Sequence, residues 1–309
     1  MTEHVGKVLA ILGNVKGFVG VTPSEAKIVR LGGMTNLVYR VETRGQQVIV
    51  RIPGEGTENY IDREVEVHNV SAAERAGVAP AVLWADSASG AMITVAIQNI
   101  ETMTPAMFKT RDGAAARAGK ALATLHRSGQ EFRFRFEMFA MIDEYLRVLA
   151  TKDVDLPEGY HAVVAAAGPV GDALNAHTVP LAPCHCDPLC ENFLDDGKKM
   201  WIVDWEYSGM NDPHWDLGDL SVEAEMDETQ ETELLTGYFG RAPSPAEKGR
   251  VVIYKAMCDL LWTLWGLIQL ADGNPVSDFR VYADTRFARC RKLMQDPLFA
   301  SHVAAVRES

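Results

Sequence analysis

The chain has 309 residues, of which 30 are lysine or arginine and 42 are aspartate or glutamate, so its formal net charge is −12. Apolar residues make up 47% of the sequence, which is typical of a globular protein with enough length for two domains or two lobes. The acidic balance argues against nucleic acid and anionic membrane surfaces as partners, because proteins that bind either normally carry a concentrated basic patch. A cationic small molecule is the substrate class that this charge favours.

The N-terminal segment does not resemble a signal peptide. Glu3 stands where a signal peptide carries positive charge, and the apolar run at residues 8–12 is too short for its apolar core. The longest strongly apolar stretch, residues 260–268, is about half of a membrane span. The five cysteines are odd in number, and three of them are crowded at Cys184, Cys186 and Cys190, which is untypical of a disulfide-bonded secreted protein. We therefore expect a cytoplasmic protein with reduced thiols and no membrane insertion.

A glycine-containing turn follows the first predicted strand. Residues 27–31 lead into Gly32-Gly33-Met34-Thr35-Asn36, and residues 37–42 and 47–52 then alternate apolar and polar side chains on either side of the turn at Arg44-Gly45. This pattern predicts an antiparallel hairpin that the glycine turn precedes.

The pattern changes from strands to helices near Gln98. A helix is predicted over residues 60–76, ended by Gly77, and a β-branched strand over residues 91–97. Most of the remaining sequence has helical spacing, so we place a boundary between a lobe of residues 1–97 and a lobe of residues 98–309. Predicted helices in the second lobe cover residues 112–126, 139–149, 160–176 with a kink at Gly168-Pro169, 253–270 and, as the last one, 278–294.

Residues 181–220 interrupt the helices and hold the densest group of polar residues. Two short predicted strands, residues 192–194 and 200–203, flank the turn Asp195-Asp196-Gly197. The sequence reads H-x-D-x-x-x-x-N, with Asp187 and Asn192 in that motif, and Asp204 follows the second strand. Because a hairpin returns the chain to where it began, these three side chains are expected to lie close together.

These residue types suit phosphoryl transfer. That reaction needs a carboxylate that orients or deprotonates the attacking hydroxyl, and oxygen ligands for the magnesium ions that bridge the nucleotide phosphates. Asp187, Asn192 and Asp204 supply this set. A glycine turn whose N–H groups cover phosphates, and Arg51 held by Glu64 or Glu66 of the following helix, would supply the nucleotide side.

The order of these features resembles the protein-kinase-like fold, and specifically the choline/ethanolamine kinases and the related aminoglycoside phosphotransferases. The segments GGMTN, VIVRIPG and DWEYSGMNDPHWDLGDL are similar to choline-kinase motifs. The resemblance implies an α+β bilobal fold with a small antiparallel N-lobe that carries one main helix, and a larger, mostly helical C-lobe. It implies an ATP- and magnesium-dependent kinase that phosphorylates the hydroxyl of choline or, as the second choice, ethanolamine.

The resemblance also implies a role for each matched residue. Asp187 would be the catalytic base and Asn192 and Asp204 the magnesium ligands. His185 and Asp216 would brace the catalytic loop and its backbone. The nucleotide-binding residues would be Gly32, Gly33, Met34, Thr35, Asn36, Arg51, Gln98 and, as the partner of Arg51 in preference to Glu64, Glu66.

The expected substrate residues lie late in the chain. LWTLW and YADTRF resemble aromatic segments of choline kinases, so Trp262, Trp265 and Tyr282 would surround the ammonium group, with Glu223 near its nitrogen. A quaternary ammonium cannot donate hydrogen bonds, and aromatic faces with a nearby carboxylate hold it well. The segment AEMDE at residues 224–228 lacks the tyrosines that the family often has there, which leaves a smaller or more acidic site and keeps ethanolamine open.

Three other interpretations stay open from the sequence. Cys184, His185, Cys186 and Cys190 are soft ligands within seven residues, but no second pair completes a tetrahedral zinc site. A kinase-like binding protein without activity is a second alternative, against which the intact set of Asp187, Asn192, Asp204 and Arg51 argues. An aminoglycoside or another hydroxylated amine as acceptor is the third, disfavoured by the paired tryptophans. A homodimer is compatible with the sequence, which carries no signal for or against it.

Overall fold

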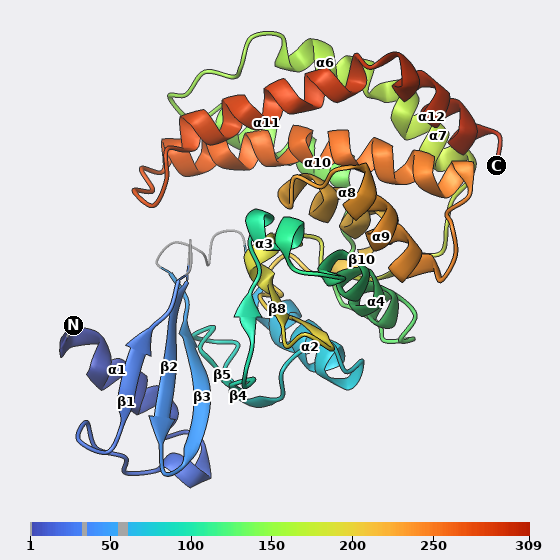
Figure 1. Ribbon diagram of the computed structural model, residues 1–309. Coiled ribbons are helices and arrows are strands. Elements are labelled where there is room, and N and C mark those ends of the chain that lie inside the picture. Colours follow the sequence, from blue (N-terminus) through green and yellow to red (C-terminus); the bar gives the residue numbers. More distant parts are fainter. Residues whose placement is uncertain (1, 33–35, 55–60) are drawn as a thin grey trace.

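The computed structural model of the protein describes residues 2–32, 36–54 and 61–309. An antiparallel sheet of five strands forms the N-terminal part, and helices dominate the rest (Figure 1). This α+β arrangement confirms the predicted fold class. In spatial order the strands are β1 (Lys27–Arg30), β2 (Leu37–Thr43), β3 (Gln46–Ile52), β5 (Met92–Val95) and β4 (Val82–Ala85).

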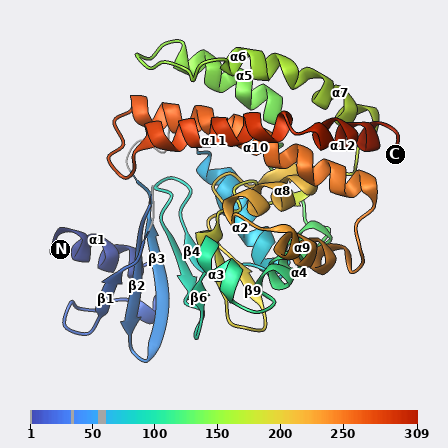
Figure 2. The ribbon, with the colours of Figure 1, turned by 45° about the horizontal axis from the view of Figure 1, so that its top comes forward.

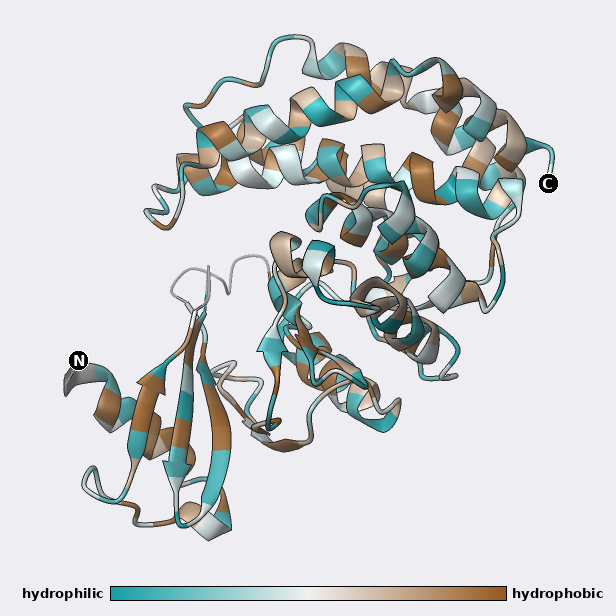
Figure 3. Cartoon of the chain, in the orientation of Figure 1, coloured by the Kyte–Doolittle hydropathy of each residue, from teal (hydrophilic) through white to brown (hydrophobic). Residues whose placement is uncertain are grey.

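One face of this sheet is buried under the N-terminal helix α1 (Thr2–Leu12). Val41 and Val50 are fully buried and belong to the same apolar cluster as Val8 and Leu12 of α1. Arg40, Glu42 and Arg51 stand next to them along the strands, and polar and apolar residues alternate there because successive side chains of a strand point to opposite faces (Figure 3). Arg51 therefore projects from the face opposite Val50.

Two elements of this part were not predicted. Helix α1 has only 11 residues, and its apolar residues pack against the sheet. Strand β4 has only four residues, mostly half-buried, so its sequence carries little alternation. Helix α1 and a short 3-10 turn, η1 (Lys16–Phe18), precede the first predicted strand.

Helix α2 (Arg63–Arg75) is the main helix beside the sheet, and it starts after the predicted residue 60. Asp62 is the N-cap, since its carboxylate accepts hydrogen bonds from the backbone N–H groups of Glu64 and Val65. The predicted stop at Gly77 is confirmed, with a left-handed φ of 79° that favours glycine. The cap fixes the first turn of α2, from which Glu66 contacts Arg51.

The helical part contains the predicted helices with small shifts at their ends, except that the helix predicted from residue 253 begins at Pro245. The predicted kink at Gly168-Pro169 is a break between two helices, α6 and α7. Three helices were missed before α10, and the predicted last helix, α11, is followed by another. The bounds are α3 (Pro105–Thr110), α4 (Ala114–His126), α5 (Met138–Leu149), α6 (Tyr160–Ala166), α7 (Gly168–Ala176), α8 (His214–Glu223), α9 (Glu228–Phe239), α10 (Pro245–Ala271), α11 (Phe279–Met294) and α12 (Pro297–Arg307).

Helix α10 is the centre of the helical part, packed against α5, α8, α11 and α12 (Figure 2). Among the described residues it is the one helix long and apolar enough to cross a membrane by length and composition. Its most apolar window is 89% buried within the protein, which is how a core helix passes that test.

A short hairpin between the helices carries the predicted motif. Strands β8 (Phe193–Asp195) and β9 (Met200–Ile202) pair with each other, and β8 also pairs with β6 (Glu101–Thr102). The 3-10 turn η3 (Cys190–Asn192) leads into β8. A second pair, β7 (Ala182–Cys184) and β10 (Gly209–Asn211), closes the base of the loop. The expected return of the chain is therefore present, with Asp187 and Asp204 on the two sides of the hairpin.

Candidate active site

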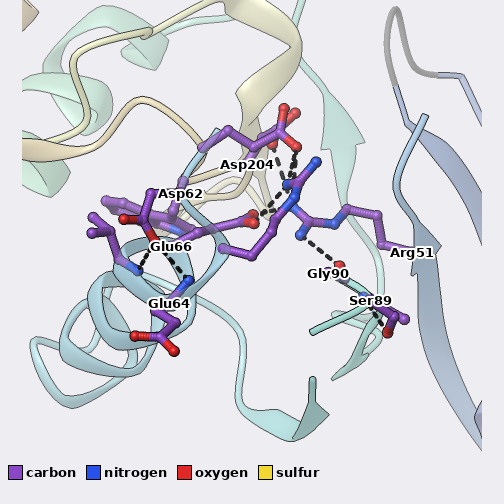
Figure 4. Close-up of polar contacts among 12 residues, drawn as sticks. Arg51, Asp62, Glu64, Glu66, Ser89, Gly90 and Asp204 are labelled. Atoms are coloured by element: carbon purple, nitrogen blue, oxygen red, sulfur yellow. Dashed lines mark hydrogen bonds and ion pairs between the residues drawn. The ribbon is translucent and has the colours of Figure 1, made fainter. Parts of the chain in front are cut away.

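Arg51 of β3 and Glu66 of α2 form the ion pair that the sequence predicts. Figure 4 shows Glu66 and Asp204 directed at the Arg51 guanidinium, whereas Glu64 points away from it. The second guanidinium nitrogen of Arg51 donates to the backbone carbonyl of Gly90 at 3.1 Å. Burial alone would lower the pKa of Arg51, but the carboxylates around it outweigh burial and raise it. The arginine is thus permanently charged and fixed in position.

Three carboxylates meet two guanidiniums at this point. Arg63 donates to Glu66 at 2.7 Å and also contacts Glu206, while Arg51 Nη1 lies 3.7 Å from Asp204 Oδ1 and 3.9 Å from Glu206 Oε1. Glu206 was not predicted as a site residue. Its position two residues after Asp204 is the feature of the sequence that could have indicated a role in the site. Its partner Arg63 is 143 residues away in sequence, so no local pattern reveals the pair. The cluster carries one more negative than positive charge.

This cluster fits a divalent cation. Carboxylate oxygens of Glu66, Asp204 and Glu206 lie within 4.8 Å of one another, and Oδ1 of Asp204 has no hydrogen-bond partner among the described residues. Burial, and next to it the charge of Glu206, raises the pKa of Asp204 to about 7. A hard cation with oxygen ligands, such as magnesium, would relieve this crowding.

Asn192 lies beside Asp204 in the way the hairpin predicts. The backbone N–H of Val203 donates to the backbone carbonyl of Asn192 at 3.0 Å. The Asn192 side-chain amide donates to the carbonyl of Asp187 at 3.0 Å, so its amide oxygen is left as the available metal ligand.

Asp216 holds the catalytic loop by its backbone. The fully buried carboxylate accepts from the backbone N–H groups of His185 at 2.7 Å and Cys186 at 2.9 Å. His126 Nε2 lies 3.0 Å from the same carboxylate. The His185 ring reaches across the hairpin to the carbonyl of Val203, with Nε2 at 2.9 Å from the oxygen. Both His185 and Asp216 therefore contact backbone, as a bracing role requires.

Asp187 is half-buried at the end of this braced loop. Burial raises its pKa well above the ordinary value, and the charges of Asp219, Asp204 and Glu223 add to the shift while Arg286 opposes it. A carboxylate in such surroundings holds a proton more readily than one in water. This property suits a group that accepts the proton of an attacking hydroxyl.

The predicted aromatic residues are brought together by the packing of α10 against α11. The ring centroids of Trp262 and Trp265 are 6.5 Å apart, and those of Trp265 and Tyr282 are 5.7 Å apart. Tyr207, which was not predicted, completes the group at 5.4 Å from Trp262 and accepts a 2.8 Å hydrogen bond from Trp265 Nε1. The Trp262 indole N–H donates to Asp219 at 3.1 Å.

Glu223 is linked to this aromatic group by an arginine that pairs with its carboxylate. Arg286 Nη2 lies 2.6 Å from Glu223 Oε1, and the guanidinium carbon is 4.4 Å from the centre of the Tyr282 ring. Arg286 is the arginine of YADTRF, so the residue was visible in the sequence while its pairing with Glu223 was not. A cation of the protein therefore already balances the carboxylate that was expected to face a substrate cation.

The family model of the "Phosphotransferase enzyme family" matches residues 27–248, which is more than half of the chain. The chain belongs to this phosphotransferase family. It is 57% identical to a choline/ethanolamine kinase family protein from Mesorhizobium loti, whose crystal structure aligns with a TM-score of 0.90 over 99% of both chains.

Other relatives belong to the same branch. Choline kinase LicA from Streptococcus pneumoniae is 29% identical, with a TM-score of 0.79 over 94% of this chain and 99% of its own. A LicA structure in complex with AMP, 28% identical, has a TM-score of 0.74 over 95% of this chain and 98% of its own. Human ethanolamine kinase 2 is 27% identical over 82% of this chain and 72% of its own. The predicted choline/ethanolamine kinase resemblance and the predicted phosphotransferase class are both confirmed.

In this phosphotransferase the predicted glycine turn is described only at its ends. Gly33, Met34 and Thr35 lie outside the described residues. Asn36 is 4% exposed, and neither polar atom of its side chain has a partner among the described residues. A Cβ on Gly32 would meet open space. Gln98 is exposed between β5 and β6, where its side-chain amide donates to Gln47 at 3.1 Å and to the Ala96 carbonyl at 3.3 Å.

The cysteine cluster of the phosphotransferase does not form a zinc site among the described residues. All five cysteines are free and buried, as the expected reduced thiols require. Burial raises the pKa of Cys184 and Cys186, so both thiols are protonated. Cys184 does lie near His126 and Asp216, but the Asp216 oxygens already accept the two backbone N–H groups of the catalytic loop.

Proposed function

We propose that this phosphotransferase is an ATP- and magnesium-dependent kinase that phosphorylates the hydroxyl of choline or ethanolamine. The observation that carries the proposal is the position of Asp187. The charges of Asp204 in the carboxylate cluster and of Glu223 both raise the pKa of Asp187, and the charge of Asp187 raises the pKa of Tyr282 in the aromatic group. A base that interacts with both a nucleotide side and an ammonium-binding side is what transfer to an amino alcohol needs.

On this proposal Arg51 binds a phosphate of the nucleotide, and Glu66 keeps the guanidinium aimed at it. The turn at residues 32–36 covers the phosphates with backbone N–H groups, and Gln98 lies at the nucleotide edge of the boundary between residues 1–97 and residues 98–309. Asn192 and Asp204 hold magnesium, with Glu206 as an additional carboxylate. The bound ion supplies charge neutralisation at the phosphates.

Asp187 orients the acceptor hydroxyl and takes its proton. The hydroxyl oxygen bonds to the γ-phosphorus, the bond from that phosphorus to the β-phosphate oxygen breaks, and ADP leaves. The raised pKa of Asp187 keeps the transferred proton on the carboxylate during the step. Trp262, Trp265 and Tyr282 present ring faces to the ammonium group, and they exclude water from it.

We place the enzyme in the cytoplasm, which the five free, buried cysteines support. The relatives named for choline and ethanolamine support the amino-alcohol acceptor. The AMP complex of a LicA protein supports a nucleotide donor.

The test is ATP consumption in the presence of magnesium with choline, ethanolamine, their N-methylated intermediates and one aminoglycoside. We expect turnover with at least one amino alcohol and none with the aminoglycoside. Turnover with the aminoglycoside alone would replace the proposed acceptor. ATP binding without turnover on any acceptor would favour a kinase-like binding protein.

A further inference from the structure

Three acidic residues lie along one side of helix α8, and each has a different partner. Asp216 holds the catalytic loop, and Glu223 is paired with Arg286. Asp219 lies between them, at spacings of three and four residues that share a helix face. Asp219 is 1% exposed, and its Oδ1 has no hydrogen-bond partner among the described residues. Asp219 neither holds the catalytic loop nor pairs with an arginine that the structure describes, so its burial needs another reason.

The charges near Glu223 balance without any substrate. Glu223 and Asp259 are contacted by Arg286 and Arg289: Arg286 lies 2.6 Å from Glu223 and 3.3 Å from Asp259, and Arg289 lies 2.7 Å from Asp259. Two carboxylates therefore face two guanidiniums, and this group is neutral. Asp219 has no ion-pair partner of its own in the described part of the chain.

Asp219 is linked to the aromatic group through an indole. Its Oδ2 accepts the hydrogen bond from Trp262 Nε1 at 3.1 Å. A carboxylate on the N–H edge pushes electron density towards the ring and strengthens the attraction of its face for a cation. The other tryptophan gives an internal contrast, because Trp265 donates its N–H to the neutral hydroxyl of Tyr207.

We infer that Asp219, acting through Trp262, is the specificity-determining residue that makes this site prefer a positively charged acceptor over a neutral alcohol of the same shape. This inference rests on the proposed function and deepens it, since it assigns to Asp219 the counter-charge that Glu223 was expected to supply. Asp219 is a positioning residue, because it is buried and acts through the hydrogen bond that it accepts from the Trp262 indole. An ammonium in the aromatic group would in turn favour the ionised form of this buried carboxylate, whose pKa burial raises.

The experiment compares choline with 3,3-dimethylbutan-1-ol, in which carbon replaces the quaternary nitrogen, so that the two alcohols differ in charge and hardly in shape. For each protein, kcat/KM is measured for both alcohols, and their ratio reports charge preference. Asp219→Asn keeps a hydrogen-bond acceptor for Trp262 and removes the charge. We expect this variant to lower the choline-to-isostere ratio by about tenfold or more.

Glu225→Gln is the matched control, because it also turns a carboxylate into an amide just past the end of α8, but Glu225 is exposed and paired with Lys109 at 3.0 Å. We expect it to leave the ratio within about twofold of wild type. Trp262→Phe keeps an aromatic face but lacks the N–H link, so it should lower the ratio in the same direction as Asp219→Asn. It also provides the test if Asp219→Asn fails to fold.

An unchanged ratio in folded Asp219→Asn, or in Trp262→Phe if only that variant folds, would overturn the inference. An equal loss on both alcohols would also overturn it, because it would mean that Asp219 is merely structural. If wild type turned over neither choline nor ethanolamine, the proposed function itself would be wrong. That result differs from a failure of the inference about Asp219, because it appears without any substitution.

Discussion

Replacing Glu66 with glutamine tests the nucleotide side of the site most sharply. Glu66 is 1% exposed and is contacted by both Arg51 and Arg63. Glutamine keeps the shape but offers a neutral amide to two buried guanidiniums. Breaking a buried pair from one side costs about 3–5 kcal/mol. Asp204 and Glu206, 3.7 and 3.9 Å from Arg51, take over part of the charge, so we expect a loss of about 2–4 kcal/mol in the free energy of unfolding.

The same helix turn offers the control. Glu64 is exposed, lies two residues earlier and points away from Arg51 (Figure 4). Glu64→Gln loses only a favourable charge at the helix N-terminus, at most about 1 kcal/mol. Urea denaturation gives both unfolding free energies, and calorimetric titration gives the ATP affinity. Glu66→Gln should also bind ATP more weakly than Glu64→Gln, because Arg51 loses its orientation. Equal effects of the two substitutions on stability and on ATP affinity would refute this account of the ion pair.

Two further predictions concern the metal cluster and the aromatic group. Burial raises the folded-state pKa of Asp204 to about 7, above that of an exposed aspartate. Between about pH 4 and 7 the folded protein therefore binds a proton that the unfolded chain has lost. As pH rises through that window, the ionisation of Asp204 lowers the free energy of unfolding. Magnesium should therefore raise the Tm more at pH 8 than at pH 5, and Asp204→Asn should lose that difference; a magnesium effect independent of pH would contradict this assignment. Trp262→Ala and Trp265→Ala should each raise KM for the amino alcohol by about 3- to 30-fold, while the Kd for ATP stays near wild type. Variants that merely unfold would show that the two rings only fill the core.

The sequence predicts most strongly those residues whose neighbours along the chain already define their role. Asp187, Asn192 and Asp204 belong to one hairpin, so their spacing alone brings them together. The choice of Glu66 over Glu64 is confirmed for a similar reason, because the position on the helix turn decides which carboxylate reaches Arg51. Local periodicity also predicted α4 and α5 within a few residues, and the C-terminal end of α10 within one.

The residues that were missed depend on partners far away in the chain. Arg63 contacts Glu206 across 143 residues, and Trp262 donates to Asp219 across 43. No local pattern marks either pair, because tertiary packing alone creates them. Helix α1 and strand β4 were missed for another reason: their segments are short, and their stability comes from packing on the sheet.

The most direct test of the central claim is product formation followed by ³¹P NMR, with wild type and Asp187→Asn given ATP, magnesium and either choline or ethanolamine. The account predicts a new phosphomonoester signal with wild type and a kcat lower by about 10²- to 10⁴-fold in the variant, with the ATP Kd unchanged. Wild-type rates of phosphomonoester formation in folded Asp187→Asn would contradict the account.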